Sequence, residues 1–374
     1  MRRHSATAGG IDLFALYRFC LSCLHCTPLL LRWAPPVAAI AEGRYSNCSS
    51  FVTNGTASSQ FAYYRFYDFR NISSDNWDDF KKPNNPNNAT AGASTNDMGW
   101  QLDWAKRDGL RDAGPNFGPN ILPIDYQPES IYIRNISSEG DKDALTALAF
   151  PSSRQNVTKL QSSGMDFTDE AILHCSLRLY ARLSGAPGAC AAFFVYKNDS
   201  QEADIELLTR NEEEVVGFNT QPTFDIHGKY IPGSHWNMSL PGNMSRETWI
   251  HYRMDWVADQ VVWYINGIEM ANTSVHVPVA PSRLSIALWG NGGSWTGNMT
   301  LGKSALLEVQ WFEVAYNLSG ASPLEKGSME CELDTDDTNH GWQPYIFPPA
   351  HDTVISLVGR ALTKGHNRGS SPMY

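Results

Sequence analysis

The chain changes character near residue 165, after which short runs of β-branched and aromatic residues alternate with clusters of Gly, Pro, Asn and Ser. Runs of this length, separated by turn residues, predict strands, and several in succession are typical of an all-β sandwich. The predicted strands cover residues 171–183, 190–196, 203–209, 249–256, 260–265, 283–289 and 305–315. Helical spacing of apolar residues is rare, so we expect an all-β fold class.

Turn residues predict how some of these strands connect. Asn266-Gly267 is a strong hairpin signal and follows the strand pattern of residues 259–266. We expect a second hairpin turn at Gly185-Ala186-Pro187-Gly188. The polar, Pro- and Asn-rich residues 72–98 predict a loop, and residues 354–362 predict a short helix outside the core.

Charge excludes one class of partner. The 374 residues carry a formal net charge of -10 at pH 7, whereas binding to nucleic acid needs a basic face. A neutral polysaccharide needs no charge match, and the chain is rich in aromatic residues, with Trp 12, Tyr 15 and Phe 16. We expect a monomer that binds no nucleic acid.

The N-terminus has the features of an export signal. Arg2 and Arg3 precede a mostly apolar stretch over residues 13–31, and Ala39-Ile40-Ala41 has the small-x-small pattern of a cleavage site. We expect residues 1–41 to form a signal peptide. A membrane anchor and a misassigned start are the alternatives, and membrane contact is expected only if this segment stays uncleaved.

Glycosylation signals agree with export to the cell exterior or cell wall. Asn-x-Ser/Thr triplets begin at Asn47, Asn54, Asn71, Asn88, Asn135, Asn156, Asn198, Asn237, Asn243, Asn272, Asn298 and Asn317. Their spread along the chain favours a secreted glycoprotein. The alternative is that a chain rich in Asn and Ser forms such triplets by chance.

Cysteine usage also fits an oxidising compartment. Outside the N-terminal segment lie Cys48, Cys175, Cys190 and Cys331, an even number that allows three pairings. We favour Cys175 with Cys190, because they flank the predicted hairpin turn, and Cys48 with Cys331, which would tie the two ends of the domain. Unpaired buried thiols are the alternative.

One short segment, Glu202-Ala203-Asp204-Ile205-Glu206, concentrates acidic residues within a predicted strand. Successive side chains of a strand point to opposite faces. The three acids therefore share one face, and the intervening apolar residues share the face that suits a core. Three acids in a row on one face repel one another, which indicates a use for them.

Glycoside hydrolysis is chemistry that needs such a group, because two carboxyls must flank the bond, one ionised and one protonated. The outer Cα atoms, of Glu202 and Glu206, should lie about 13 Å apart. Their carboxyls must therefore lean together to reach the roughly 5–5.5 Å of a retaining enzyme, with Asp204 sharing a proton between them. A solvated strand face is the alternative, since such triplets also arise by chance.

The surroundings of the triplet resemble glycoside hydrolase family 16 in order and spacing over residues 125–320. The family has an aromatic strand before the acids, an Asn-bearing strand after them, two Trp- and Tyr-rich strands, a late strand ending in Trp and a closing strand. In this chain these are residues 191–196, 215–219, 249–256, 263–267, 284–289 and 306–316. Residues 201–209 are particularly similar to fungal members. Ala287 departs from the Asn that many members have there.

The resemblance implies a jelly-roll of two curved antiparallel sheets with a concave substrate cleft. It also implies retaining hydrolysis of β-1,3 or mixed β-1,3-1,4 glucan, with Glu202 as nucleophile, Asp204 as its helper and Glu206 as general acid/base. The catalytic domain is expected over residues 42–335 and a C-terminal extension or tail over residues 336–374. A cell-wall transglycosylase and a non-catalytic, lectin-like protein are the alternatives.

Sugar rings have apolar faces, so aromatic side chains are candidates for substrate contact. The aromatic candidates are Trp256, Trp263, Trp289 and Trp295. Asn219 and Gln221 are candidates for hydrogen bonds to sugar hydroxyls. The alternatives are a core position for each Trp and loop satisfaction for the two amides.

No cofactor is required by this chemistry. Asp334, Asp336 and Asp337 could hold a structural calcium ion, which prefers oxygen ligands. Their spacing completes no calcium-loop motif, so a solvated acidic loop is the favoured alternative.

Overall fold

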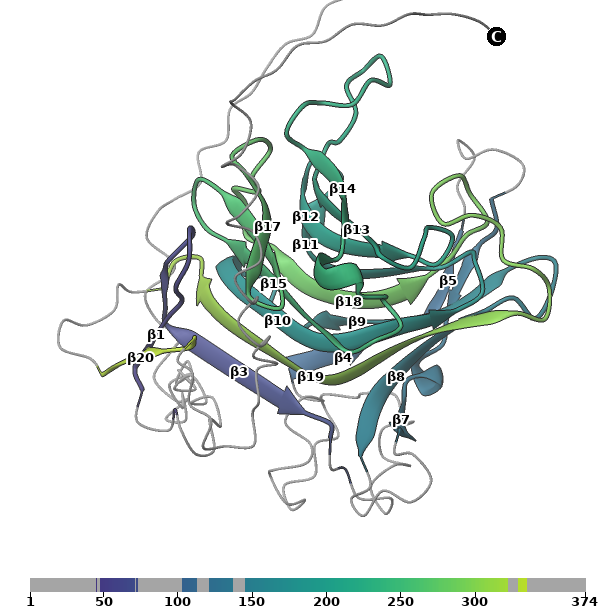
Figure 1. The fold of residues 1–374 in the computed structure, drawn as a ribbon, viewed down its shortest axis with the longest axis horizontal. Coiled ribbons are helices and arrows are strands. Elements are labelled where there is room, and N and C mark those ends of the chain that lie inside the picture. The colour runs from purple at the N-terminus through teal and green to yellow at the C-terminus, as the bar shows by residue number, and fades with distance from the viewer. Residues whose placement is uncertain are drawn as a thin grey trace, which may run out of the picture. The chain divides into compact units, whose positions relative to one another are not determined.

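Alternation of apolar and polar residues builds two mainly antiparallel sheets around a shared hydrophobic core (Figure 1). The computed structural model describes Tyr45, Ile72 and residues 48–70, 103–112, 121–136, 145–321 and 329–334. All of these residues belong to one compact unit. The predicted all-β class is confirmed, and so is each predicted strand to within a few residues at its ends.

The first sheet is organised around two long, curved strands, β10 and β19 (Figure 1). Its order is β17 (Ile268–Thr273), β16 (Val261–Ile265), β15 (Ile250–Trp256), β10 (Ile172–Gly185) and β19 (Ser304–Leu318). Beyond β19, β8 (Thr146–Ser153) pairs with the first half of β19 and β3 (Tyr63–Asp68) pairs with its second half. The last strand, β7 (Tyr132–Asn135), pairs with β8.

The second sheet contains the acidic segment. Its order is β14 (His235–Ser239), β13 (Val215–Thr220), β12 (Gln201–Leu208), β11 (Cys190–Asn198), β18 (Arg283–Trp289), β9 (Leu160–Phe167) and β4 (Trp104–Lys106). At its start, β9 also pairs with β8 and runs parallel to β6 (Ile124–Tyr126), which pairs with β5 (Gly109–Arg111). Two short 3-10 helices, η3 (Pro128–Ser130) and η4 (Pro241–Asn243), lie in connections.

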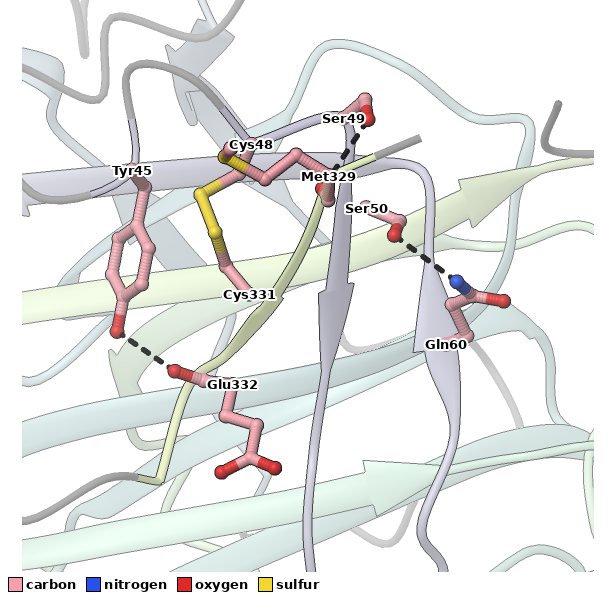
Figure 2. The surroundings of a disulfide bond; sticks show 8 residues. All are labelled: Tyr45, Cys48, Ser49, Ser50, Gln60, Met329, Cys331 and Glu332. Atoms are coloured by element: carbon pink, nitrogen blue, oxygen red, sulfur yellow. Dashed lines mark hydrogen bonds between the residues drawn. A yellow bond between two sulfur atoms is a disulfide. The ribbon is translucent and has the colours of Figure 1, made fainter. Parts of the chain in front are cut away.

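Cys48 and Cys331 form a disulfide, as predicted, with Cα atoms 5.8 Å apart (Figure 2). The bond lies at a three-stranded sheet of β2 (Gln60–Phe61), β1 (Ser50–Val52) and β20 (Glu330–Glu332), in which β1 and β20 run parallel. Ser49 Oγ donates to the Met329 carbonyl at 3.2 Å beside it. Segments from the two ends of the domain are thus held side by side.

The predicted Cys175–Cys190 disulfide is wrong, because both cysteines are free and buried. Residues 185–188 do not close a hairpin: β10 pairs within the first sheet and β11 within the second. Cys175 lies in the main core, whereas Cys190 lies in a small cluster with Trp289 and Trp295. The Asn266-Gly267 hairpin is confirmed, with positive φ at both residues, 49° and 78°.

Several predictions fall outside the described residues: the signal peptide over residues 1–41, the tail over residues 336–374, the loop at residues 73–98 and the helix at residues 354–362. In the described ranges there is no helix of the length and apolarity that a membrane crossing requires.

Candidate active site

Strand β12 places its three acids on one face, as its alternation predicts. Ala203, Ile205 and Leu207 lie in the main core, so the side chains between them point away from it. Asp204 is 4% exposed despite lying on the outer face. The acids are therefore clustered and partly desolvated, and they do not form a solvated strand face.

Glu206 is the most extensively bonded of the three. Its Oε1 accepts hydrogen bonds from Trp295 Nε1 at 3.1 Å and from the Cys190 thiol at 3.3 Å, and its Oε2 accepts one from Asn219 Nδ2 at 2.9 Å. Burial and the charge of Glu206 raise the pKa of Cys190 well above its usual value, so the thiol keeps its proton and acts as a donor. Donors from three strands or loops thus fix this carboxyl group.

Asp204 shares one of these donors. Asn219 lies directly opposite Asp204 on β13, and its Nδ2 donates to Asp204 Oδ1 as well as to Glu206. The Oδ1 of Asn219 accepts a hydrogen bond from Nδ1 of His235, its partner on β14. A single amide therefore joins two acids to a histidine.

Glu202 lies at the other end of the row and differs from its neighbours. In the part of the chain that the structure describes, its carboxyl accepts no side-chain hydrogen bond. Tyr196 lies opposite Glu202 on β11, and Arg283 lies opposite Tyr196 on β18. Tyr196 and Arg283, with Glu170 and Lys197, line a cavity of about 220 Å³. Tyr196 thus lies between Glu202 and this cavity, and Glu202 itself does not line it.

The three carboxyls shift one another's titration. Burial and the charge of Glu206 raise the pKa of Glu202 to about 8, against the opposing charges of Arg107 and Arg111. Burial and the two flanking charges raise the pKa of Asp204 well above its usual value. Burial also raises the pKa of Glu206, although its three hydrogen-bond donors oppose the shift. The cluster therefore retains protons at neutral pH.

The structure separates the predicted substrate residues into two groups. Trp295 donates to Glu206, and Trp289 packs in the same small cluster around Cys190, so substrate contact stays a prediction for both. Trp256 and Trp263 are 0% exposed in the main core, so the prediction that they contact substrate is wrong. Their side chains face inward from the first sheet, which is the core position given as the alternative.

The two predicted amides have different positions. Asn219 is 1% exposed and its side chain bonds to Asp204, Glu206 and His235. It therefore holds the two acids in place. Gln221 is half-buried, and its backbone N–H donates to the Glu202 carbonyl at 3.0 Å. Its Oε1 accepts a hydrogen bond from the Thr223 backbone N–H at 3.1 Å, so the side chain has the loop role that was the alternative to substrate contact.

Sequence reasoning did not identify Cys190, His235 or Arg107 as site residues. Cys190 had been assigned to a disulfide, and His235 lies in a short strand that the patterns did not predict. Arg107 packs over the rings of Phe194 and Tyr126 at 5.5 Å and 5.3 Å. Only cross-strand register brings these residues to the acids, and a single sequence does not reveal register.

Asp334, a predicted calcium ligand, forms ion pairs with Arg178 at 2.9 Å and Arg253 at 3.1 Å. Asp336 and Asp337 lie outside the described residues. Among those that are described, no group of three or more His, Cys, Asp or Glu side chains could hold a metal ion. The ion pairs give Asp334 a role in joining β20 to the first sheet.

Known proteins with similar sequences point to one family. Residues 134–312 match the family model for glycosyl hydrolases family 16. A β-glucanase of Paenibacillus polymyxa is 25% identical over 137 residues, which are 35% of this chain and 54% of that protein. A Crh-like protein, UTR2, of Candida albicans is 25% identical over 126 residues, 30% of this chain and 25% of that protein. The chain thus spans about half the length, or less, of these relatives.

Among solved structures, a prokaryotic β-1,3-1,4-glucanase (lichenase) from a mouse hindgut metagenome superposes with a TM-score of 0.46 at 14% identity. The match covers 68% of this chain and 99% of that one. From the sequence match, the chain contains a glycoside hydrolase family 16 domain, as the resemblance predicted. Members of this family hydrolyse glycosidic bonds, and the acidic row on β12 lies inside the matched range.

Proposed function

We propose that this domain is a retaining hydrolase of β-glucan in which Glu202 is the nucleophile, Glu206 the general acid/base and Asp204 the group that tunes both. The row of three partly desolvated carboxyls on β12 carries the proposal. Within the described part of the chain, no basic side chain forms an ion pair with any of the three. Their charges are therefore free to change during a reaction.

The chemistry divides into two steps. The reactive form of the coupled acids is the one in which Glu202 is ionised and Glu206 holds the proton. The Glu202 carboxylate attacks the anomeric carbon and the bond to the leaving oxygen breaks, while Glu206 gives its proton to that oxygen. In the second step Glu206 takes a proton from water, the water oxygen attacks the anomeric carbon and the Glu202 carboxylate leaves. Both carboxyls end in their starting state.

Coupling between the acids supports the change of role of Glu206. When Glu202 becomes an ester, it loses its charge, and the pKa of Glu206 falls because a repelling neighbour has gone. The three hydrogen-bond donors on Glu206 then favour its carboxylate, the form needed to activate water. Asp204, which prefers to stay protonated, can return a proton to the pair.

The test uses purified protein on laminarin and on mixed-linkage glucan, with products identified. Glu202→Gln should lower the rate by about a thousandfold or more, and the exposed Glu212→Gln should leave it unchanged. Adding azide to Glu202→Ala should give an α-glycosyl azide, whereas Glu206→Ala should give the β-anomer, because each variant opens a different face. Glucan cleavage that survives Glu202→Gln would refute the assignment.

The same experiment with a labelled acceptor oligosaccharide distinguishes water from sugar as the final acceptor. Label that enters long products would replace hydrolysis by transfer, with the same residues in the same roles. Binding without any cleavage would favour the lectin-like alternative.

A further inference from the structure

His235 adjoins the acids without touching them. It lies opposite Asn219 in the pairing of β13 with β14, and its Nδ1 bonds to Asn219 Oδ1. On its other side, Asn237 Nδ2 lies 3.2 Å from His235 Nε2. The histidine is therefore held between two amides.

The proton positions on His235 follow from its two hydrogen-bond partners, Asn219 and Asn237. The amide of Asn219 turns its Nδ2 toward Asp204 Oδ1 and Glu206 Oε2, and its Oδ1 toward His235. That oxygen needs a donor, which places a proton on Nδ1. A neutral imidazole carries one proton, so Nε2 is then free to accept from the exposed amide of Asn237, whose Nδ2 lies 3.2 Å away.

We propose that His235 is a positioning residue for the general acid/base: as the neutral Nδ1–H tautomer, it locks the Asn219 amide in the orientation that holds Asp204 and Glu206. This inference rests on the proposed function for the role of Glu206. The hydrogen bonds run in one direction, from Asn237 through His235 and Asn219 to the two acids. Reversal of the Asn219 amide would direct its oxygen at both carboxyls.

Packing holds the imidazole in place. Its ring stacks on Tyr230 at 4.9 Å with an interplanar angle of 9°, and Tyr230 stacks on Phe224 at 4.3 Å. Trp295, which also donates to Glu206, meets the imidazole edge-on at 6.2 Å. Burial lowers the pKa of His235, which favours the neutral ring that the hydrogen bonds with Asn219 and Asn237 require. The β13–β14 connection is thus coupled to Glu206 through this ring.

A leaving-group comparison tests the role. Acid catalysis matters for a poor leaving group and hardly at all for a good one such as 2,4-dinitrophenolate. His235→Ala should therefore slow kcat on a 4-methylumbelliferyl laminarioside by about tenfold, the loss of one hydrogen bond, and on the 2,4-dinitrophenyl analogue by less than about twofold. His235→Gln, which can still donate to Asn219, should recover most of the rate on the poor substrate.

The exposed His227, in the loop between β13 and β14, provides the matched control, and His227→Ala should change neither rate. An equal loss on both substrates in His235→Ala would show a merely structural effect and overturn the proposal, as would no loss on either.

A second measurement needs no activity and so separates this inference from the proposed function. Nitrogen-15 NMR of the histidine side chains should show His235 as the Nδ1–H tautomer at pH 7, and Asn219→Leu should abolish that preference. A dominant Nε2–H tautomer in the wild-type protein overturns the proposal even if the protein cleaves glucan. A protein that shows the expected tautomer but cleaves no glycan would instead refute the proposed function.

Discussion

Two aspartates, Asp204 buried and Asp166 half-buried, pair across one row of the second sheet, and their surroundings give them opposite properties. Asp166 on β9 pairs with Ser285, which pairs with Phe194, which pairs with Asp204 on β12. Their positions are equivalent in the row, since both point away from the main core. The difference lies in what the neighbouring side chains donate.

Asp166 is bound by a cation. Arg107 donates to it from Nη2 at 2.7 Å and from Nε at 3.1 Å, and Ser285 Oγ donates at 2.6 Å. Burial opposes ionisation, but these hydrogen bonds and the charge of Arg107 outweigh it and lower the pKa of Asp166. Among the described residues, Asp204 receives a side-chain hydrogen bond from Asn219 alone, and burial and the two flanking acids raise its pKa. Burial alone therefore does not decide the charge of an acid; its partners do.

The largest expected effect comes from neutralising one aspartate at a time. Asp204→Asn should lower kcat/KM by about a hundredfold with little change in stability, because it replaces an acid that already prefers the neutral form. Asp166→Asn should do the reverse, lowering the free energy of unfolding with little change in rate, because it removes the charge that Arg107 compensates. Glucan assays and urea unfolding of both variants measure this, and matching profiles would contradict the contrast drawn between the two residues.

Removing the cation should sharpen the same contrast. Arg107→Met leaves the half-buried Asp166 without its main partner, and the free energy of unfolding should fall by about 1–2 kcal/mol, between the values for exposed and buried pairs. The double variant Arg107→Met with Asp166→Asn should recover most of that loss, since no charge is then left unpaired. Urea unfolding of the two singles and the double gives the coupling, and strict additivity would show that the pair does not act as a unit.

The third prediction concerns pH. The folded pKa of Glu202 is raised to about 8, while an unfolded Glu titrates near 4.3. The folded state therefore binds more protons over this interval, so the stability that Glu202 contributes is complete below about 4.3 and is lost as the pH rises through about 8. Glu202→Gln should reduce the fall of Tm between pH 5 and pH 8. A parallel Tm profile in variant and wild type would contradict the raised pKa.

The smallest expected effect concerns the thiol donor on Glu206. Cys190→Ala should lower kcat/KM by about threefold, since a neutral thiol is a weak donor. Cys175→Ala, the other buried cysteine, should leave the rate unchanged because it lies in the main core. Rate measurements on both variants at one pH suffice, and a larger effect at Cys175 would indicate that packing matters more than donation.

Local pattern predicts much of this molecule. Alternation within residues 203–207 places the acids opposite the core, and Asn266-Gly267 predicts its hairpin. The identity of each strand's neighbours is a different matter, because pairing joins residues far apart in the chain. The supports of Glu206 come from β11, β13 and the loop after β18. Residue 190 was therefore assigned to a disulfide, since nothing local places it beside the acid.

The tryptophans show the same limit. Trp256 and Trp295 look alike as aromatic residues in a β-rich chain, yet one is 0% exposed and the other contacts Glu206. Alternation along a strand such as β15 shows that its two faces differ, but it does not show which face a second sheet covers. It does not apply to Trp295, which lies in the loop after β18. The covered face depends on the stacking of the sheets, which the sequence expresses only through the whole set of strands.

The disulfide has a consequence for how the chain matures. Cys48 and Cys331 are separated by 283 positions, and their strands meet only when β1 and β20 lie side by side. Closing a long loop is entropically slower than closing a short one, so an early oxidant would meet Cys175 and Cys190 first. The correct bond therefore forms most readily when the two sheets bury Cys175 and Cys190 before oxidation. Oxidation of Cys48 and Cys331 then follows the assembly of the sheets.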